Sequence, residues 1–196
     1  MQLVPATLYD GMTQTQIASA TASWQPWVDD YVAVLKQQNV HMEDWPQHAH
    51  WNWNRKASSV SGLLAYQLLG IECDGLMQGL MLTGTLGRCK ISNQAGNPLV
   101  DVHFLATAPW NLRSFVSQPR FGLVGKILIV AAVQISLDNG FRGRIGLHSL
   151  KQAESFYLND CGMTDLGIDT GPEGQGLRYF ETTPEQAKII LNGARQ

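Results

Sequence analysis

One stretch limits the fold more than any other: a long apolar helix that follows a loop containing two glycines. The stretch runs from Pro119 to Gly140 and reads PRFGLVGKILIVAAVQISLDNG. From Leu123 to Leu137 the apolar residues recur at helical spacing, and Asn139-Gly140 supplies residues that end helices in the left-handed conformation. We therefore expect a helix over 123–139 that starts directly after a glycine-bearing loop.

The segment before this loop predicts a strand. Residues 99–106 (LVDVHFLA) are rich in β-branched and aromatic side chains, and Pro109 soon afterwards cannot donate a ladder hydrogen bond. With a period of two, Asp101, His103 and Leu105 share one face, and Val100, Val102 and Phe104 share the other. Asp101 and His103 are therefore expected about 7 Å apart on one side of the strand.

The rest of the chain supplies further strands and helices. We expect an amphipathic helix over 13–38, interrupted at Pro26, and a tryptophan-rich segment with a second short helix. Two apolar runs, 63–73 and 76–86, flank Asp74-Gly75, which is a strong hairpin signal. Further elements are expected as strands over 143–148, 164–170 and 177–181, a short helix at 153–157 and a closing helix over 183–191.

The start of the helix at 123 suits an anion. The segment from 113 to 144 carries about four net positive charges in a chain whose net charge is −2. A helix start presents unpaired N–H groups, and Gly122 and Gly125 let oxygens approach the backbone. Two common nucleotide motifs are excluded, because Ile127 stands where a P-loop needs a hydroxyl and the GxGxxG fingerprint is absent.

The loop and the elements around it resemble the GCN5-related N-acetyltransferase superfamily. Arg120 and Gly125 match the first and last positions of its acetyl-CoA motif, Gln/Arg-x-x-Gly-x-Gly/Ala, while Leu123 replaces the middle glycine. The segment AESFY, which ends at Tyr157, resembles the final helix of the family, although Gly162 follows Tyr157 one residue later than is usual. The resemblance covers the core of the fold from Leu63 onward.

This resemblance implies a fold and an activity. The fold is α/β of mixed α+β type, with a central mixed, mostly antiparallel sheet of about six to seven strands flanked by helices. The whole chain, 1–196, is expected to form a single acyl-CoA N-acyltransferase-like domain. The activity is acetyl-CoA-dependent transfer of an acetyl group to an amine by direct attack in a ternary complex. The alternative is a catalytically degenerate member of the fold that binds CoA as a sensor or interaction module.

The resemblance also implies the site residues. Acetyl-CoA, the co-substrate, is expected to bind at the strand end and at the glycine loop, through Leu105, Ala106, Thr107, Arg120, Phe121, Gly122, Leu123, Val124, Gly125 and Lys126. Asp101 lies where histone-type members carry a glutamate base, and His103 on the same face is the second candidate. Tyr157 is the candidate acid beside the CoA sulfur. Each candidate also has a purely structural alternative: Asp101 can form a salt bridge, His103 can be a core histidine, and Tyr157 can pack in the core. Glu72 and Asp74 are further candidates for the base, and their structural alternative is a role in the turn.

Composition limits the partners. With 14 basic and 16 acidic residues, the chain does not have the charge of a dedicated nucleic-acid binder. No apolar stretch reaches the roughly 18 residues of a membrane span, and the N-terminus lacks a signal-peptide pattern. Three cysteines without CxxC spacing are typical of a cytoplasmic protein with reduced thiols.

Two features remain open. His48-x-His50 suggests a metal ligand pair, but no second pair with matching spacing accompanies it, so we expect no metal and a tryptophan-anchored helical layer instead. The acceptor can be a small molecule or a protein amine, because the segments expected to form its pocket, 24–60 and 107–119, carry no motif. A homodimer is compatible with such a fold.

Overall fold

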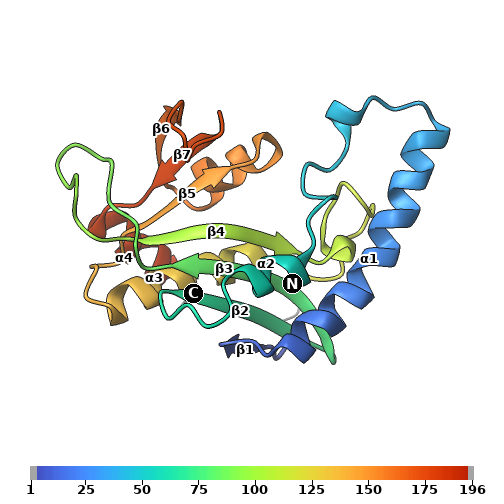
Figure 1. Cartoon of the computed structure of the whole chain (residues 1–196), viewed down its shortest axis with the longest axis horizontal. Coiled ribbons are helices and arrows are strands. Elements are labelled where there is room, and N and C mark those ends of the chain that lie inside the picture. Colours follow the sequence, from blue (N-terminus) through green and yellow to red (C-terminus); the bar gives the residue numbers. More distant parts are fainter. Residues whose placement is uncertain (1–3, 194–196) are drawn as a thin grey trace. The chain divides into compact units, whose positions relative to one another are not determined.

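A computed structural model describes residues 4–193 of the chain (Figure 1). The strands are β1 Thr7–Asp10, β2 Tyr66–Cys73, β3 Leu76–Gly84, β4 Val100–Thr107, β5 Ile145–Ser149, β6 Thr164–Ile168 and β7 Arg178–Glu181. The α-helices are α1 Gln14–Gln37, α2 Trp53–Ser59, α3 Val124–Asp138 and α4 Pro184–Gly193. Short 3₁₀ turns lie at Met42–Asp44 (η1), Pro109–Asn111 (η2) and Lys151–Ala153 (η3), and a π-helical turn lies at Phe156–Asp160 (η4).

The strands of the described residues form a mixed sheet in the order β1-β2-β3-β4-β5-β7-β6. β4 and β5 pair in parallel, with Val100 opposite Ile145, whereas β1 with β2, β5 with β7, and β6 with β7 pair antiparallel. The expected fold class, a mostly antiparallel mixed sheet flanked by helices, is therefore confirmed.

The chain divides into two compact units. The first comprises residues up to Met81 together with Leu105–Gly125, and the second comprises Leu82–Phe104 together with the residues from Lys126 onward. Strands β3 and β4 each contribute residues to both units. The single domain over 1–196 stays a prediction, and residues 1–3 and 194–196 lie outside the described residues.

In the first unit, α1 packs its apolar side on the hairpin of β2 and β3. The Trp24 indole N–H donates to the Met77 carbonyl at 2.9 Å, and Ile17 and Trp24 are buried. Asp74 and Gly75 have φ values of 54° and 71°, which is the conformation of a type I′ hairpin turn. The hairpin predicted at Asp74-Gly75 is thus confirmed.

Helix α1 is continuous through Pro26, so the predicted interruption is wrong. Thr13 and Gln16 form a capping box at its start, and the helix runs unbroken from Gln14 to Gln37. Proline removes one helical hydrogen bond, but Trp24 before it and Leu35 after it are both buried. Packing on both sides of Pro26 therefore keeps the helix in one piece.

The second unit contains strands β5, β6 and β7, helix α4 and helix α3 from Lys126 onward (Figure 1). Leu128, Ile129 and Val133 of α3 are fully buried, which explains the apolar run in the sequence. The Glu181 carboxylate of β7 is also buried, and it accepts hydrogen bonds from the backbone N–H groups of Lys90 and Ile91 and from the Gln94 side chain. These bonds hold the connection between β3 and β4 against β7.

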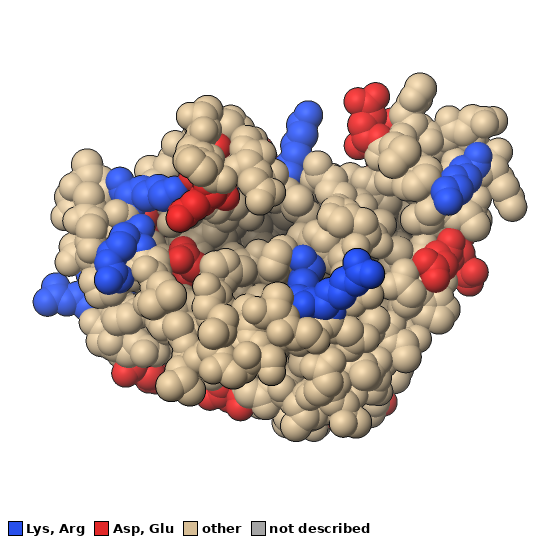
Figure 2. Space-filling view, viewed as in Figure 1, with Lys and Arg blue, Asp and Glu red and all other residues tan. Residues whose placement is uncertain are grey.

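Figure 2 shows acidic and basic side chains gathered in a few places on the visible face, with broad areas of other residues between them. Helix α3, the most apolar of the helices, has 15 residues. None of the helices in residues 4–193 combines the length and the hydrophobicity that crossing a bilayer requires.

Candidate active site

Strand β4 presents its side chains in the alternation that the sequence predicts. Val100 and Val102 are buried, whereas Asp101 is half-buried and His103 is exposed. Asp101 and His103 therefore lie on the less buried face of the strand, and both belong to the second unit.

Asp101 lies in an environment that favours its protonated form. Burial, with the nearby Glu173 carboxylate as the second cause, raises the pKa of Asp101 to about 6, and the Lys90 ammonium opposes this shift only partly. Gly87 lies so close to the Asp101 carboxylate that a side chain at position 87 would displace it. A carboxylate with a pKa near 6 is ionised at neutral pH and still a stronger base than an ordinary aspartate.

His103 lies next to a second imidazole that the sequence analysis did not single out. Although the residue as a whole is exposed, desolvation by the surrounding protein lowers the pKa of His103, and His148 of β5 lowers it further, while Glu173 opposes the shift. The parallel pairing of β4 and β5 ends at Asp101 and Gly146, and His103 and His148 each follow two residues later in their own strands. At neutral pH, His103 is therefore an uncharged imidazole that can accept a proton.

His148 belongs to a polar cluster with Lys90, Asp169 and Tyr179. One oxygen of Asp169, Oδ2, contacts His148 Nε2 at 2.7 Å and Lys90 Nζ at 2.6 Å. The Lys90 ammonium lies 4.4 Å from the Tyr179 ring, and the rings of His148 and Tyr179 lie 4.8 Å apart. Hydrogen bonds from Lys90 and His148 hold the pKa of Asp169 well below its usual range. No sequence motif reveals this cluster, because its members come from segments far apart in the chain.

Tyr157 lies in the second unit within η4, the π-helical turn. Its side chain is buried, and its ring packs against the rings of Phe156 and Phe180 at 5.1 and 5.9 Å. Burial raises the pKa of its hydroxyl, with Cys161 as a second cause, so the hydroxyl carries its proton at neutral pH. Tyr157 can therefore act as a proton donor.

The π turn accounts for the unusual spacing after Tyr157. The Cys161 N–H donates to the Phe156 carbonyl at 3.0 Å, a bond that spans five residues instead of the four of an α-helix. The wider turn takes up one additional residue before Gly162. The short helix expected at 153–157 is thus a 3₁₀ turn followed by a π turn.

The glycine loop lies in the first unit up to Gly125, and Lys126 follows in the second unit within the first turn of α3. Leu123, which replaces the middle glycine of the motif, has a φ of 65°. This left-handed conformation is rare for a branched side chain and ordinary for glycine. The loop therefore keeps a glycine-like backbone at the position where glycine is missing.

Two hydrogen bonds to the 3₁₀ turn η2 hold the start of the glycine loop. The Phe121 N–H donates to Asn111 Oδ1 at 3.0 Å, and the Arg120 N–H donates to the Trp110 carbonyl at 3.0 Å. Asn111 and Trp110 in turn both donate to the buried Gln78 side chain of β3. The Arg120 guanidinium is partly exposed and contacts the Asp74 carboxylate at 3.1 Å.

The remaining predicted residues lie at the end of β4 in the first unit. Ala106 is buried, and Leu105 and Thr107 are half-buried. The next N–H, that of Ala108, donates to the Gln78 carbonyl at 2.8 Å. Gln78 thus anchors both the strand end and the segment before the glycine loop.

The structure places the predicted site residues in two groups. Leu105 to Thr107 and Arg120 to Gly125 belong to the first unit, and Asp101, His103, Lys126 and Tyr157 belong to the second. Within the second unit, Asp101 and His103 share one strand face, whereas Tyr157 lies in η4 and its ring packs against Phe180. Glu72 accepts a hydrogen bond from Tyr9 at 3.0 Å.

Comparison with known proteins gives matches among solved structures but none among family models or curated sequences. No protein-family model and no curated protein sequence matches the chain. The structure of PaiA N-acetyltransferase from Thermoplasma acidophilum in complex with coenzyme A matches with a TM-score of 0.57 and 13% identity, over 92% of this chain and 99% of that chain. A protein assigned to the GNAT family of acetyltransferases, from Desulfovibrio desulfuricans, matches with a TM-score of 0.56 and 11% identity, over 92% and 99% of the two chains.

A third match is FeeM, an N-acyl amino acid synthase from uncultured soil microbes, with a TM-score of 0.56 and 8% identity over 97% of this chain and 96% of that chain. At these identities the matches establish the architecture. The resemblance seen in the sequence is confirmed at this level: the chain has the fold of the GCN5-related N-acetyltransferase superfamily.

Proposed function

We propose that this protein is an acetyl-CoA-dependent N-acetyltransferase, which moves an acetyl group to an amine acceptor by direct attack in a ternary complex. The observation that carries the proposal is the left-handed backbone of Leu123 in the loop that opens helix α3. A leucine is strained in this conformation and a glycine is not, and this supports the assignment of position 123 to the middle glycine of the motif.

The loop and the helix start would hold the pyrophosphate of the co-substrate. Backbone N–H groups of the first turn of α3 have no partners within the helix, and they lie at the positive end of its dipole. Arg120 and Lys126 add two positive charges next to these groups. The residues Phe121 to Gly125 would contribute the backbone that approaches the phosphate oxygens.

The end of β4 would hold the acetyl group. Acetyl-CoA supplies a thioester whose carbonyl becomes an oxyanion when the amine attacks it. In this proposal, backbone N–H groups at Leu105 to Thr107 would donate to this oxygen, and such donors are worth several kcal/mol, on the order of 3, in acyl transfer.

Asp101 and Tyr157 are the proposed base and acid. The Asp101 carboxylate, directly or through a water, takes the proton that the attacking amine loses; His103 is the alternative base. The C–S bond then breaks, and the Tyr157 hydroxyl gives its proton to the leaving sulfur. The raised pKa of Asp101, about 6, suits a base, and the raised pKa of Tyr157 means that its hydroxyl carries a proton at neutral pH.

The buried thiols favour direct attack over a covalent acetyl-cysteine. Burial raises the pKa of the Cys161 thiol to about 12 and that of Cys89 to about 11. A thiol must lose its proton to act as a nucleophile, and these two keep it at neutral pH.

Calorimetric titration with acetyl-CoA tests the proposal. We expect wild-type binding to weaken at least tenfold in Arg120→Ala and to disappear in Gly125→Glu, which places a carboxylate where phosphate oxygens bind. Arg55→Ala is the matched control, because it removes one exposed positive charge from α2. If acetyl-CoA does not bind the wild-type protein, or if all three variants bind it equally well, the proposal is wrong.

Release of free CoA in the presence of amines separates the enzyme from a CoA-binding sensor. Acetyl-CoA binding without CoA release across a broad panel of amines would favour the catalytically degenerate alternative. CoA release that depends on both an amine and Arg120 would establish the transferase.

A further inference from the structure

A buried glutamine of β3 connects segments of the first unit that are far apart in the sequence. Gln78 is 1% exposed, and its side-chain amide makes four hydrogen bonds. Nε2 donates to the carbonyls of Cys73 and Leu76, which flank the hairpin turn, at 3.0 Å each. Oε1 accepts from Trp110 Nε1 at 2.8 Å and from Asn111 Nδ2 at 3.0 Å. Because both hydrogens and both lone pairs of the amide are used, only one orientation satisfies all four partners.

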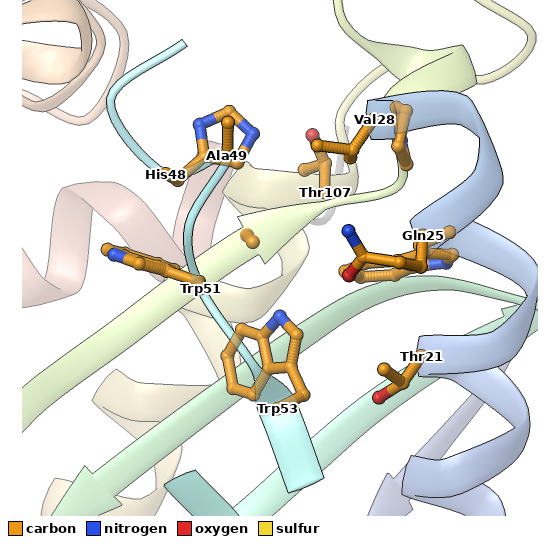
Figure 3. Close-up of a pocket in the computed structure, with 11 residues that line it drawn as sticks. Thr21, Gln25, Val28, His48, Ala49, Trp51, Trp53 and Thr107 are labelled. Atoms are coloured by element: carbon orange, nitrogen blue, oxygen red, sulfur yellow. The ribbon is translucent and has the colours of Figure 1, made fainter. Parts of the chain in front are cut away.

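The backbone of Gln78 also holds the end of β4. Figure 3 shows Thr107 at this strand end, and the N–H of the next residue, Ala108, donates to the Gln78 carbonyl at 2.8 Å. The 3₁₀ turn Pro109–Asn111 follows directly, and its Asn111 N–H donates to the Ala108 carbonyl at 2.9 Å. The turn is therefore fixed through both the main chain and the side chain of Gln78.

Asn111 extends this restraint to the glycine loop. Its Nδ2 donates to Gln78, and its Oδ1 accepts from the Phe121 N–H at 3.0 Å, so the two side chains form a continuous link that we call the amide bridge. Phe121 stands two residues before Leu123, whose φ of 65° is strained for a leucine. Such a backbone persists only where its surroundings fix it, and the amide bridge is one of the contacts that do so.

We propose that Gln78 and Asn111 are positioning residues for the co-substrate, because the amide bridge holds the glycine loop in the conformation that binds the pyrophosphate. The inference rests on the proposed function, which assigns the pyrophosphate to residues 121–125. Neither side chain is assigned a contact with acetyl-CoA, and both act through the backbone of the loop. A loop that is already ordered loses less conformational entropy when its ligand binds, and it therefore binds more tightly.

Asn111→Leu is the main variant, because leucine is close to asparagine in size and can neither donate to Gln78 nor accept from Phe121. We expect calorimetric titration to show at least tenfold weaker binding of acetyl-CoA with an unchanged number of sites per protein. Loss of stability alone would lower the number of sites and leave the affinity of the folded protein unchanged. The titration therefore separates positioning from a purely structural role.

Ser136→Ala is the matched control in the second unit. It removes a buried hydroxyl of α3 that donates to the Arg144 carbonyl at 2.7 Å. This variant should unfold at a lower temperature than the wild type, because it loses a buried hydrogen bond. Its affinity for acetyl-CoA should stay within about threefold of the wild type, since the hydroxyl is not linked to the glycine loop.

Hydrogen exchange of single amides gives a local readout. In Asn111→Leu, the Phe121 amide should exchange at least tenfold faster than in the wild type, because it loses its acceptor. The Ala108 amide, which donates to the Gln78 backbone, should keep its rate within about twofold. An equal increase at both amides would indicate general loosening of the segment and would overturn the inference.

Gln78→Met tests the other end of the amide bridge. Methionine is close to glutamine in shape and lacks the amide, so acetyl-CoA should again bind at least tenfold more weakly. Combining this substitution with Asn111→Leu should weaken binding no further than the weaker single variant does, because the two residues act on the loop through one link. Additive losses would refute the bridge. Should Gln78→Met not fold, titration and hydrogen exchange of Asn111→Leu decide the question.

The inference and the proposed function fail in different ways. If acetyl-CoA binding depends on Arg120 but Asn111→Leu binds as tightly as the wild type, the positioning role is wrong and the proposed function stands. If binding depends on both residues but no amine leads to CoA release, the positioning role stands and the transferase is wrong. If the wild type does not bind acetyl-CoA, the proposed function is wrong and the positioning role falls with it.

Discussion

Replacing Asp101 with asparagine should make the protein more stable at neutral pH while it removes the proposed base. Burial raises the pKa of Asp101 from 3.8 to about 6, so the folded protein holds this proton more tightly than the unfolded chain does. The ionised carboxylate is therefore a cost to folding, and stability due to this group falls as the pH rises from about 4 to about 6. Asparagine has nearly the same shape and cannot ionise.

The size of the effect follows from the pKa shift. A shift of about two units at about 1.4 kcal/mol each corresponds to a gain on the order of 3 kcal/mol above pH 6, and to almost none at pH 4, where Asp101 is protonated in the folded protein. In a chain of 196 residues this gain corresponds to a rise of several degrees in the unfolding midpoint.

Urea unfolding of both proteins between pH 4 and pH 8 measures the difference directly. Asp138→Asn, at an exposed carboxylate of α3, controls for the loss of one negative charge. In Asp101→Asn, CoA release should fall at least tenfold. In the wild type, CoA release should decline below about pH 6 as Asp101 becomes protonated. An Asp101→Asn variant that is less stable than the wild type at pH 7.5, or whose stability difference does not change with pH, would refute the reasoning.

Two further substitutions test the loop and the acid. Leu123→Gly should raise stability by about 1 kcal/mol and leave acetyl-CoA binding equal or tighter, because glycine adopts a φ of 65° without strain; Leu123→Ala, which stays strained, should show no such gain in urea unfolding and calorimetry. Tyr157→Phe should lower turnover at least tenfold and keep acetyl-CoA affinity within about threefold of the wild type, since only the donated proton is lost; unchanged turnover would remove Tyr157 from the mechanism.

The features that the sequence predicts well are those that depend on neighbours in the chain. The hairpin at Asp74-Gly75 follows from turn chemistry, and the alternation along β4 follows from the side-chain period of a strand. Helix α3 is nearly as long as its apolar pattern, Val124–Asp138 against 123–139. Each of these patterns lies within a short stretch and needs no knowledge of the tertiary structure.

The features that the sequence does not predict depend on packing or on strand register. His148 and Asp169 meet because β5 and β6 both pair with β7, and Lys90 joins them because its backbone N–H is bonded to Glu181 of β7; no spacing in the chain encodes this meeting. The continuity of α1 through Pro26 is decided by burial on both sides of the proline. The π turn at Tyr157 shifts one hydrogen bond by one residue, a change too small to alter the pattern of apolar residues.

Leu123 adopts a backbone conformation that glycine adopts without strain, although its side chain is branched. The cost of a leucine in the left-handed region is roughly 1–2 kcal/mol, which is small against the stability of a domain of this size. The anchors on both sides of Leu123 oppose this cost, since the Phe121 N–H is bonded to Asn111 and Val124 is buried. The leucine side chain itself is 53% exposed, so it does not have to fit into a packed core. What phosphate oxygens require is the backbone conformation, and therefore the missing glycine at 123 does not argue against an anion site in this loop.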